Sequence, residues 1–207
     1  MDLDLPHLAA IAAALGWASG LRLYAVVFLT GAAGYLGWVP LPAGLHLLQT
    51  PLVLGASFAM LVLEFCADKI PGFDTLWDTI HTFIRIPAGA ALAAGVFGGD
   101  HESWSLVAAL LGGTLAATAH AAKTTTRAAV NTLPEPFSNI GLSLLGDAAV
   151  PGMLWLSWSH PALFFVALAA SIVLALVLTV VLFRFLRRLL ARLGGRPVAE
   201  ARELTAS

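Results

Sequence analysis

The feature that most constrains this chain is an uninterrupted apolar run from Pro161 to Phe183, which contains no charged residue. A transmembrane helix needs about 20 such residues, because the hydrocarbon core of a bilayer is roughly 30 Å thick. Inside that core every backbone N–H and C=O must be bonded within the protein, so the run is predicted to be an α-helix. We therefore expect an integral membrane protein.

The composition of the whole chain supports this expectation. Hydrophobic residues make up 59% of the chain and charged residues 11%, whereas about a quarter of the residues of a soluble domain are charged. This excludes an ordinary soluble enzyme and a disordered chain, and the single cysteine excludes a disulfide scaffold. The net charge of −1 offers no basic field to nucleic acid. The expected partner is the lipid bilayer.

Five further apolar segments precede this run, and they are 8–36, 51–70, 74–97, 103–132 and 138–157. The predicted fold is all-α, a polytopic transmembrane bundle of about six spans over residues 1–193, with a short cytoplasmic tail at 194–207. The acidic amino terminus does not resemble a secretory signal, so Leu8 onward is expected to be mature protein.

Positive charge predicts the orientation of these spans. The last span is followed by a cluster of arginines, which marks the cytoplasmic side: Arg184, Arg187, Arg188, Arg192 and Arg196. An even number of spans would place the amino terminus in the cytoplasm as well. The loops at 38–50 and 100–102 would then face outward, and neither contains Lys or Arg.

Two of the segments are too long for a simple span. At 1.5 Å per residue, 103–132 would form a helix of about 45 Å, so it must be strongly tilted or broken, and the same holds for 8–36. The two segments begin possible repeat halves, 8–97 and 103–192, in which Arg22 and Arg127 occupy matching positions. Three spans per half would make the repeats inverted, and interrupted segments at matching positions are typical of a transporter's binding site.

Charged residues recur within or beside the apolar segments. Each would cost about 2.5–3.5 kcal/mol if it faced lipid at the bilayer centre. They are Arg22, Lys69, Arg85, Lys123 and Arg127, balanced by Glu64, Asp68, Asp78, Glu135 and Asp147, with His81 and His120 among them. Helical spacing places many of them on shared faces. They could be ion pairs that hold the bundle together, but small residues and apolar packing suffice for that. We therefore favour a functional polar cavity.

One part of this set is rich in hydrogen-bond donors. The expected substrate-binding residues are Arg22, Lys123, Thr124, Arg127, Asn131 and Asn139. Arginine binds phosphate or carboxylate bidentately, and lysine adds a point charge. The Pro-Glu-Pro sequence at 134–136 must interrupt the helix, and the free N–H groups of the next helix would favour an anion. An ordinary cytoplasmic turn explains Pro-Glu-Pro equally well.

A second part of the set is rich in carboxylates. Its expected role is proton coupling or gating, carried by Glu64, Asp68, Lys69, Asp78, His81, Arg85, His120, Glu135 and Asp147. The carboxylates could instead coordinate a hard cation, but Lys69 and Arg85 would compete for them. Arg85 is expected to pair with another segment rather than with Asp78, which lies two helical turns earlier.

Signatures of enzymes are mostly missing. There is no His-Glu-x-x-His zinc motif, and we expect no cofactor and no bound metal. An intramembrane enzyme acting on lipid through His81 or His120 stays as an alternative. Homodimerisation through Gly89, Gly95 and Gly112 is a further possibility, although internal packing explains these glycines equally well.

Three stretches carry a resemblance to a known family: 16–24, 68–90 and 123–139. Together they resemble the bacterial integral membrane proteins catalogued as domain of unknown function 4126. The resemblance implies several transmembrane helices in a bacterial inner membrane, and it implies no activity.

From the residues themselves we expect a small transporter or permease with a polar, charged cavity at the midplane. Its substrate would be a small anionic or phosphate-bearing solute or a lipid head group. The alternatives are a cation or proton channel or carrier that uses the carboxylates, and a non-transporting lipid enzyme or membrane subunit.

Overall fold

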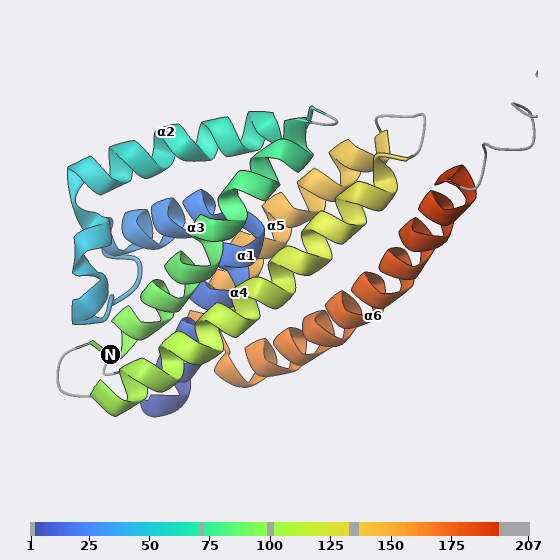
Figure 1. Cartoon of the computed structure of the whole chain (residues 1–207). Helices are drawn as coiled ribbons and strands as arrows, with labels where there is room; N and C mark the ends of the chain where they lie inside the picture. The colour runs from blue at the N-terminus through green and yellow to red at the C-terminus, as the bar shows by residue number, and fades with distance from the viewer. Residues whose placement is uncertain (1–2, 71–72, 99–101, 133–136, 195–207) are drawn as a thin grey trace, which may run out of the picture.

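The computed structural model describes residues 3–70, 73–98, 102–132 and 137–194, and within them it contains helices and no strands. The helices, in chain order, are α1 (Leu5–Tyr35), the 3-10 helix η1 (Ala43–Gln49), α2 (Pro51–Ala67), α3 (Phe73–Val96), α4 (Glu102–Val130), α5 (Phe137–Ser159) and α6 (Pro161–Gly194) (Figure 1). The all-α bundle predicted from the sequence is confirmed, and each apolar segment coincides with one helix.

Five of the helices are long and apolar enough to cross a membrane, and η1 with α2 would make a sixth span as a pair bent by 69°. The protein is therefore a multi-pass membrane protein. The segment 38–50, which we expected to be an outer loop, contains η1. Its Leu45 and Leu48 are buried, so this short helix is part of the packed structure.

The first long segment is broken rather than tilted. Arg22, with φ −146° and ψ 77°, lies outside the helical region and divides α1 into two arms. Gly16 and Gly20 do not form the break. Their role is to allow close packing of α1 against α4. A Cβ atom added to either glycine would overlap the backbone of Gly112 or Ala116.

The other long segment is not broken, because α4 runs as one helix from Glu102 to Val130. The hydroxyls of its threonines donate hydrogen bonds to carbonyl groups one turn earlier in the same helix. The Thr124 hydroxyl donates to the carbonyl of His120 at 3.0 Å, and the Thr126 hydroxyl donates to that of Ala122 at 2.7 Å. The first helices of the two proposed repeat halves therefore differ, and the inverted repeat is not confirmed.

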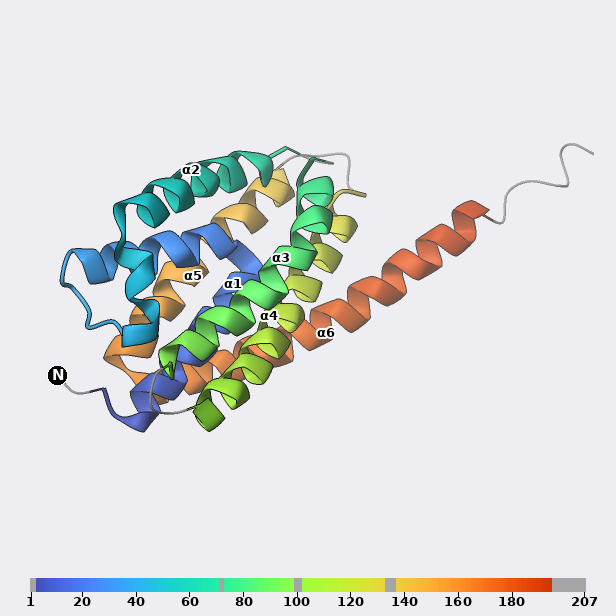
Figure 2. The same ribbon diagram turned by 60° about the vertical axis from the view of Figure 1, so that its left-hand side comes forward.

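Both ends of α1 lie at the same end of the bundle. A straight helix of 31 residues would hold its ends about 45 Å apart. Instead, Asp4 at one end of α1 and Trp38 just beyond the other line a single cavity of about 660 Å³, together with Trp155 and Trp158 near the end of α5. The helix thus enters the bundle, turns at Arg22 and returns, as its two arms show in Figure 2.

The N-terminal end of the bundle is the one where α1 begins and where α3 and α5 end. The tail end is the opposite one, where α2, α4 and α6 end (Figure 1).

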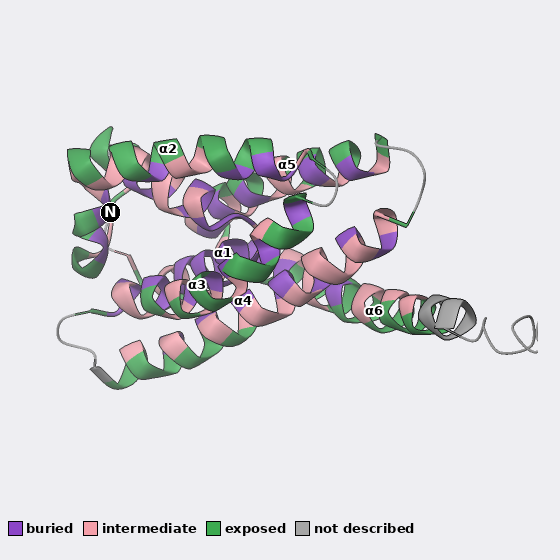
Figure 3. Cartoon of the chain, turned by 45° about the horizontal axis from the view of Figure 1, so that its top comes forward, coloured by how far each residue is buried: buried purple, intermediate pink, exposed green. Residues whose placement is uncertain are grey.

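The core lies around the first arm of α1, where Ala10, Ala14, Leu15 and Ala18 have no exposed surface. Burial is greatest along α1, and outward-facing exposed surface marks α2 and α6 (Figure 3). Towards the tail end α6 diverges from the other helices (Figure 2). As far as Phe183 its exposed side chains, such as those of Val173 and Val177, are apolar and suit contact with lipid.

The glycines considered for dimer contacts pack within the chain. Gly89 faces Gly16 and Ala116, and Gly112 lies against Ala93 and Gly89. Gly95 likewise packs against η1. Internal packing therefore accounts for all three, and they offer no support for a dimer.

Candidate functional site

The charged side chains meet in the half of the bundle nearest the tail end. We call them the charge network: Arg22, Glu64, Asp68, Lys69, Asp74, Asp78, Arg85, His120, Lys123, Arg127 and Asp147. Asp74 is in the first turn of α3, and Arg85 follows about 16 Å further along it. The network thus extends from the edge of the bundle to near its middle, rather than lying only at the midplane.

Asp68, the residue that caps the C-terminus of α2, is the centre of the network. Its carboxylate is fully buried and lies 2.5 Å from Arg22 Nη1, 3.2 Å from Lys123 Nζ and 3.3 Å from Arg127 Nη2. These three cations are the ones that the sequence assigned to an anionic substrate. In this structure they surround a carboxylate of the protein itself.

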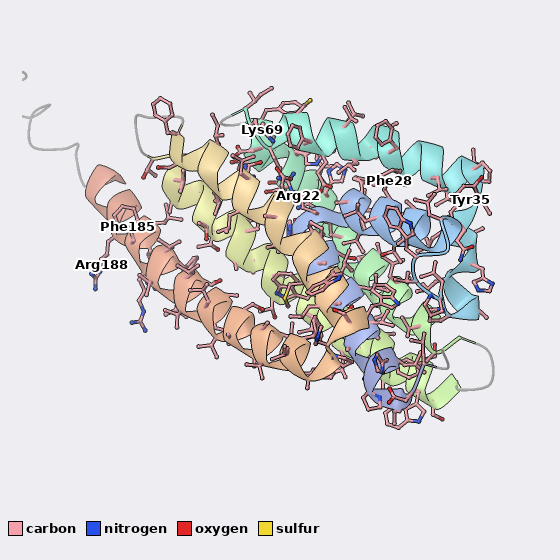
Figure 4. The ribbon with its side chains drawn as sticks, turned by 180° about the vertical axis from the view of Figure 1, so that it is seen from behind. Arg22, Phe28, Tyr35, Lys69, Phe185 and Arg188 are labelled. Carbon is pink, nitrogen blue, oxygen red and sulfur yellow. The ribbon has the colours of Figure 1, made fainter. Side chains whose placement is uncertain are left out.

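Each of the three cations has a second acidic partner. Arg22 Nη2 lies 2.8 Å from Asp147, Lys123 Nζ 3.0 Å from Asp78, and Arg127 Nη1 3.0 Å from Asp74. Asp147 also lies 3.5 Å from Lys69 Nζ, and Figure 4 shows Arg22 and Lys69 beside the same part of α5. Arg22 is fixed further by its bonds to the carbonyl and the hydroxyl of Ser143, at 3.1 and 2.9 Å.

Arg85 forms a second group with Glu64 and Asp78. Its two terminal nitrogens donate to these carboxylates, each at 2.7 Å. Arg85 was expected to pair with another segment, and it does so with Glu64 of α2, but its guanidinium also reaches Asp78 across two turns of α3. His120 borders this group: its Nδ1 lies 3.4 Å from Arg85, and its Nε2 shares a 2.6 Å hydrogen bond with the Thr82 hydroxyl.

The two asparagines were expected to bind substrate. They bond instead to a carboxylate of the chain itself. Asn139 donates to Asp74 at 3.1 Å and accepts from Arg127 at 3.1 Å, and Asn131 donates to Asp74 at 3.2 Å. Asp74 was absent from the predicted site residues. Its position four residues before Asp78, on the same helical face, was the signal that could have found it.

Two other predicted site residues stand apart from the network. The Nδ1–H of His81 donates to the carbonyl oxygen of Trp77 in its own helix at 2.8 Å, and the ring packs between Trp77 and Tyr24. The Thr124 hydroxyl is bonded within α4. Glu135 lies outside the described residues.

Three cavities follow one another along α1 and α5. The cavity at the N-terminal end, already described, shares Leu29 and Pro151 with a second one of about 350 Å³, which reaches Arg22 and Asp147. A third, also about 350 Å³, has Arg22 and Asp68 in its wall. Arg22 therefore stands between the second and third cavities, with one of its acidic partners in each.

The network has not used all of its hydrogen-bonding capacity. Among the described residues, Glu64 Oε2 and Arg85 Nε have no hydrogen-bond partner although both atoms are buried. An unsatisfied buried group costs about 1–3 kcal/mol.

The network is built of ion pairs. Within the described ranges, no group of three or more His, Cys, Asp or Glu side chains could hold a metal ion. The network carboxylates lie against arginine or lysine instead.

These observations define an all-α, multi-pass membrane protein whose interior contains a network of paired charges. The chain belongs to the family described as Domain of unknown function (DUF4126), whose model matches residues 9–181. No curated protein and no solved structure matches the chain.

Proposed function

We propose that this protein is a small transporter for an anionic solute that bears a phosphate or a similar group, or for a lipid head group. One observation carries the proposal: Arg22, at the break of α1, separates two cavities. It pairs with Asp147 on the side of the second cavity and with Asp68 on the side of the third.

The mechanism follows from the exchange of partners around Arg22. An anion that reaches Arg22 from either cavity competes with the carboxylate on that side, and the guanidinium can hold an oxyanion with two parallel hydrogen bonds. A helix that is already broken at this residue needs no further loss of helical hydrogen bonds to move there. Asp68 and Asp147 then act as the two gates, and coupling to protons stays a prediction.

The orientation of the chain also needs a proposal. Two cytoplasmic termini were expected because an even number of spans was counted, with α1 as one of them. Because α1 returns to the end at which it begins, that count no longer holds. We propose that the arginines at the end of α6 mark the cytoplasmic side and that the amino terminus lies on the opposite side.

Anion uptake into proteoliposomes tests the proposal. Purified protein is reconstituted, and the entry of a panel of labelled carboxylates and phosphate esters is compared with that into protein-free vesicles. We expect saturable uptake that Arg22→Gln reduces at least about tenfold, because a lost charged hydrogen bond of about 1.5–3 kcal/mol corresponds to a change of that order.

Arg184→Gln on the exposed part of α6 is the matched control, since it removes an arginine that lies outside the charge network. The proposal is overturned if folded protein carries none of the panel. It is also overturned if cation flux is observed that Asp68→Asn or Asp78→Asn abolishes while Arg22→Gln leaves it intact, because that result supports the cation carrier.

A further inference from the structure

We infer that the third cavity binds the phosphate head group and the upper part of an acyl chain of a membrane lipid, and that Asp68 holds the position of the phosphate until the lipid arrives. The inference that the bound lipid is also transported rests on the proposed function. Binding of the lipid stands on the geometry of the cavity and can be measured separately.

The third cavity has apolar walls and one charged side. Apolar side chains from α1, α4, α5 and α6 form the walls, and they include Trp17, Leu142, Met153 and Leu178. At the rim, Leu145 and Leu174 are 66% and 58% exposed on helices that face the bilayer. A ligand can therefore enter from the lipid, and an apolar chain can stay in the cavity without contacting water.

The charged side of this cavity is built from buried groups. Arg22 and Arg127 are each 2% exposed and Asp68 is fully buried, and all three belong to the cavity wall together with Lys123. Two guanidinium groups and one ammonium at a single locus suit an oxyanion with several acceptor oxygens. A phosphate monoester provides three such oxygens and a charge of about −1.5 to −2.

Asp68 is the carboxylate that a ligand can replace at the lowest cost. Among the described carboxylates, it is the one that contacts all three of Arg22, Lys123 and Arg127. If it moves away, each cation keeps its other acidic partner, so no buried cation is left unpaired. A phosphate that takes its place finds the same three donors, with the apolar cavity beside them for the chain.

The test measures binding of three probes to purified protein in detergent. Dioctanoyl phosphatidic acid carries both a phosphate and chains, dioctanoylglycerol carries the same chains without the phosphate, and inorganic phosphate carries no chain. We expect the first to bind at least about tenfold more tightly than either of the others, since each lacks one set of contacts and about 1.4 kcal/mol corresponds to tenfold. Equal affinity for inorganic phosphate would overturn the lipid as the source of the head group.

A variant that fills the cavity separates this site from general detergent-like binding. A Cβ added to Gly146 in the cavity wall meets only Arg22 Nε, at 3.8 Å, so Gly146→Leu has room to place its side chain there. Gly152→Leu on the exposed side of the same helix meets nothing within 4 Å and is the matched control. We expect Gly146→Leu to abolish binding and Gly152→Leu to retain it; binding retained by both would overturn the site.

The role of Asp68 predicts a gain in affinity rather than a loss. If the phosphate position is free for roughly one tenth of the time in the wild type, Asp68→Asn raises the affinity for dioctanoyl phosphatidic acid about tenfold. Arg127→Gln lowers it, whereas Arg184→Gln, an exposed cation outside both the cavity wall and the charge network, leaves it unchanged. An unchanged or weaker affinity in folded Asp68→Asn would overturn the replacement by phosphate.

These results are distinguishable from those that bear on transport. Lipid binding without any uptake or translocation in proteoliposomes would contradict the proposed function and support this inference. Uptake of a water-soluble anion that Gly146→Leu does not alter would support the transporter and overturn the lipid.

Discussion

At the scale of single residues, the network shows how a charge becomes acceptable inside a membrane. Each network cation contacts at least one carboxylate, and Arg22, Arg85, Lys123 and Arg127 each contact two or more. Pairing of this kind avoids the cost of isolated charges, and removing a partner is costly where it leaves a buried charge with less compensation. The stability of the protein should therefore depend on the burial of the residue that is changed.

Glu64 provides the sharpest test of this dependence. Its carboxylate is fully buried and accepts from Arg85 at 2.7 Å. Glu64→Gln removes the charge but keeps the shape, and we expect a loss of about 3–5 kcal/mol because the guanidinium is left with less compensation. Unfolding of the purified protein in a denaturing detergent measures it.

Lys69→Gln is the control for that measurement. Lys69 is a quarter exposed and lies 3.5 Å from Asp147, so its loss should cost only about 0–1 kcal/mol. Equal destabilisation by the two variants would show that burial does not determine the strength of these pairs.

At the scale of helices, α1 decides how the other elements are arranged. Its first arm lies close to α4 because Gly16 and Gly20 bring the two backbones together. Its second arm runs beside α2, where Phe28 meets Phe58 at 5.3 Å between ring centroids. The break at Arg22 lets one helix serve both contacts and places the guanidinium where the two arms meet.

The close approach of α1 and α4 predicts a strict size limit at Gly20. In Gly20→Ala the added Cβ would overlap the carbonyl oxygen of Ala116, which belongs to backbone and cannot turn aside. We expect a loss of about 1–3 kcal/mol from overpacking. Thermal unfolding followed by circular dichroism measures it.

Gly55→Ala in α2 is the matched helical glycine, because its added Cβ meets nothing within 4 Å. That variant should be neutral or more stable by up to about 1 kcal/mol, since alanine favours helix over glycine. If Gly20→Ala proves as harmless as Gly55→Ala, the two helices do not pack as closely as described.

At the scale of the whole molecule, the return of α1 changes what the protein presents on each side of the membrane. One end of the bundle has both ends of α1 and the cavity of about 660 Å³. The other end has the charge network and, on α6, the arginines that project away from the bundle, such as Arg188 (Figure 4). The molecule is therefore asymmetric along the bundle axis, with the large cavity at one end and the charges at the other.

Cysteine labelling tests this topology. In a Cys66→Ser background, Leu3→Cys and Trp38→Cys should react with a membrane-impermeant maleimide from the same face, because they flank the two ends of α1. Arg188→Cys should react from the opposite face. Labelling of Leu3→Cys and Trp38→Cys from different faces would mean that α1 crosses the bilayer and that its two ends are far apart.

The sequence by itself determined the helices, the membrane as their solvent and most members of the charge network. These properties are local: apolar length predicts a span, and a charge within it must face inward wherever the neighbouring helices lie. Only the tertiary structure decided that α1 turns back at Arg22, that Asp74 joins the network and that Asp68 occupies the place expected for a substrate anion. The physical reason is that an ion pair depends on the lateral order and rotation of helices. Arg22 finds Ser143 and Asp147 more than a hundred residues away, and no pattern within one segment contains that distance.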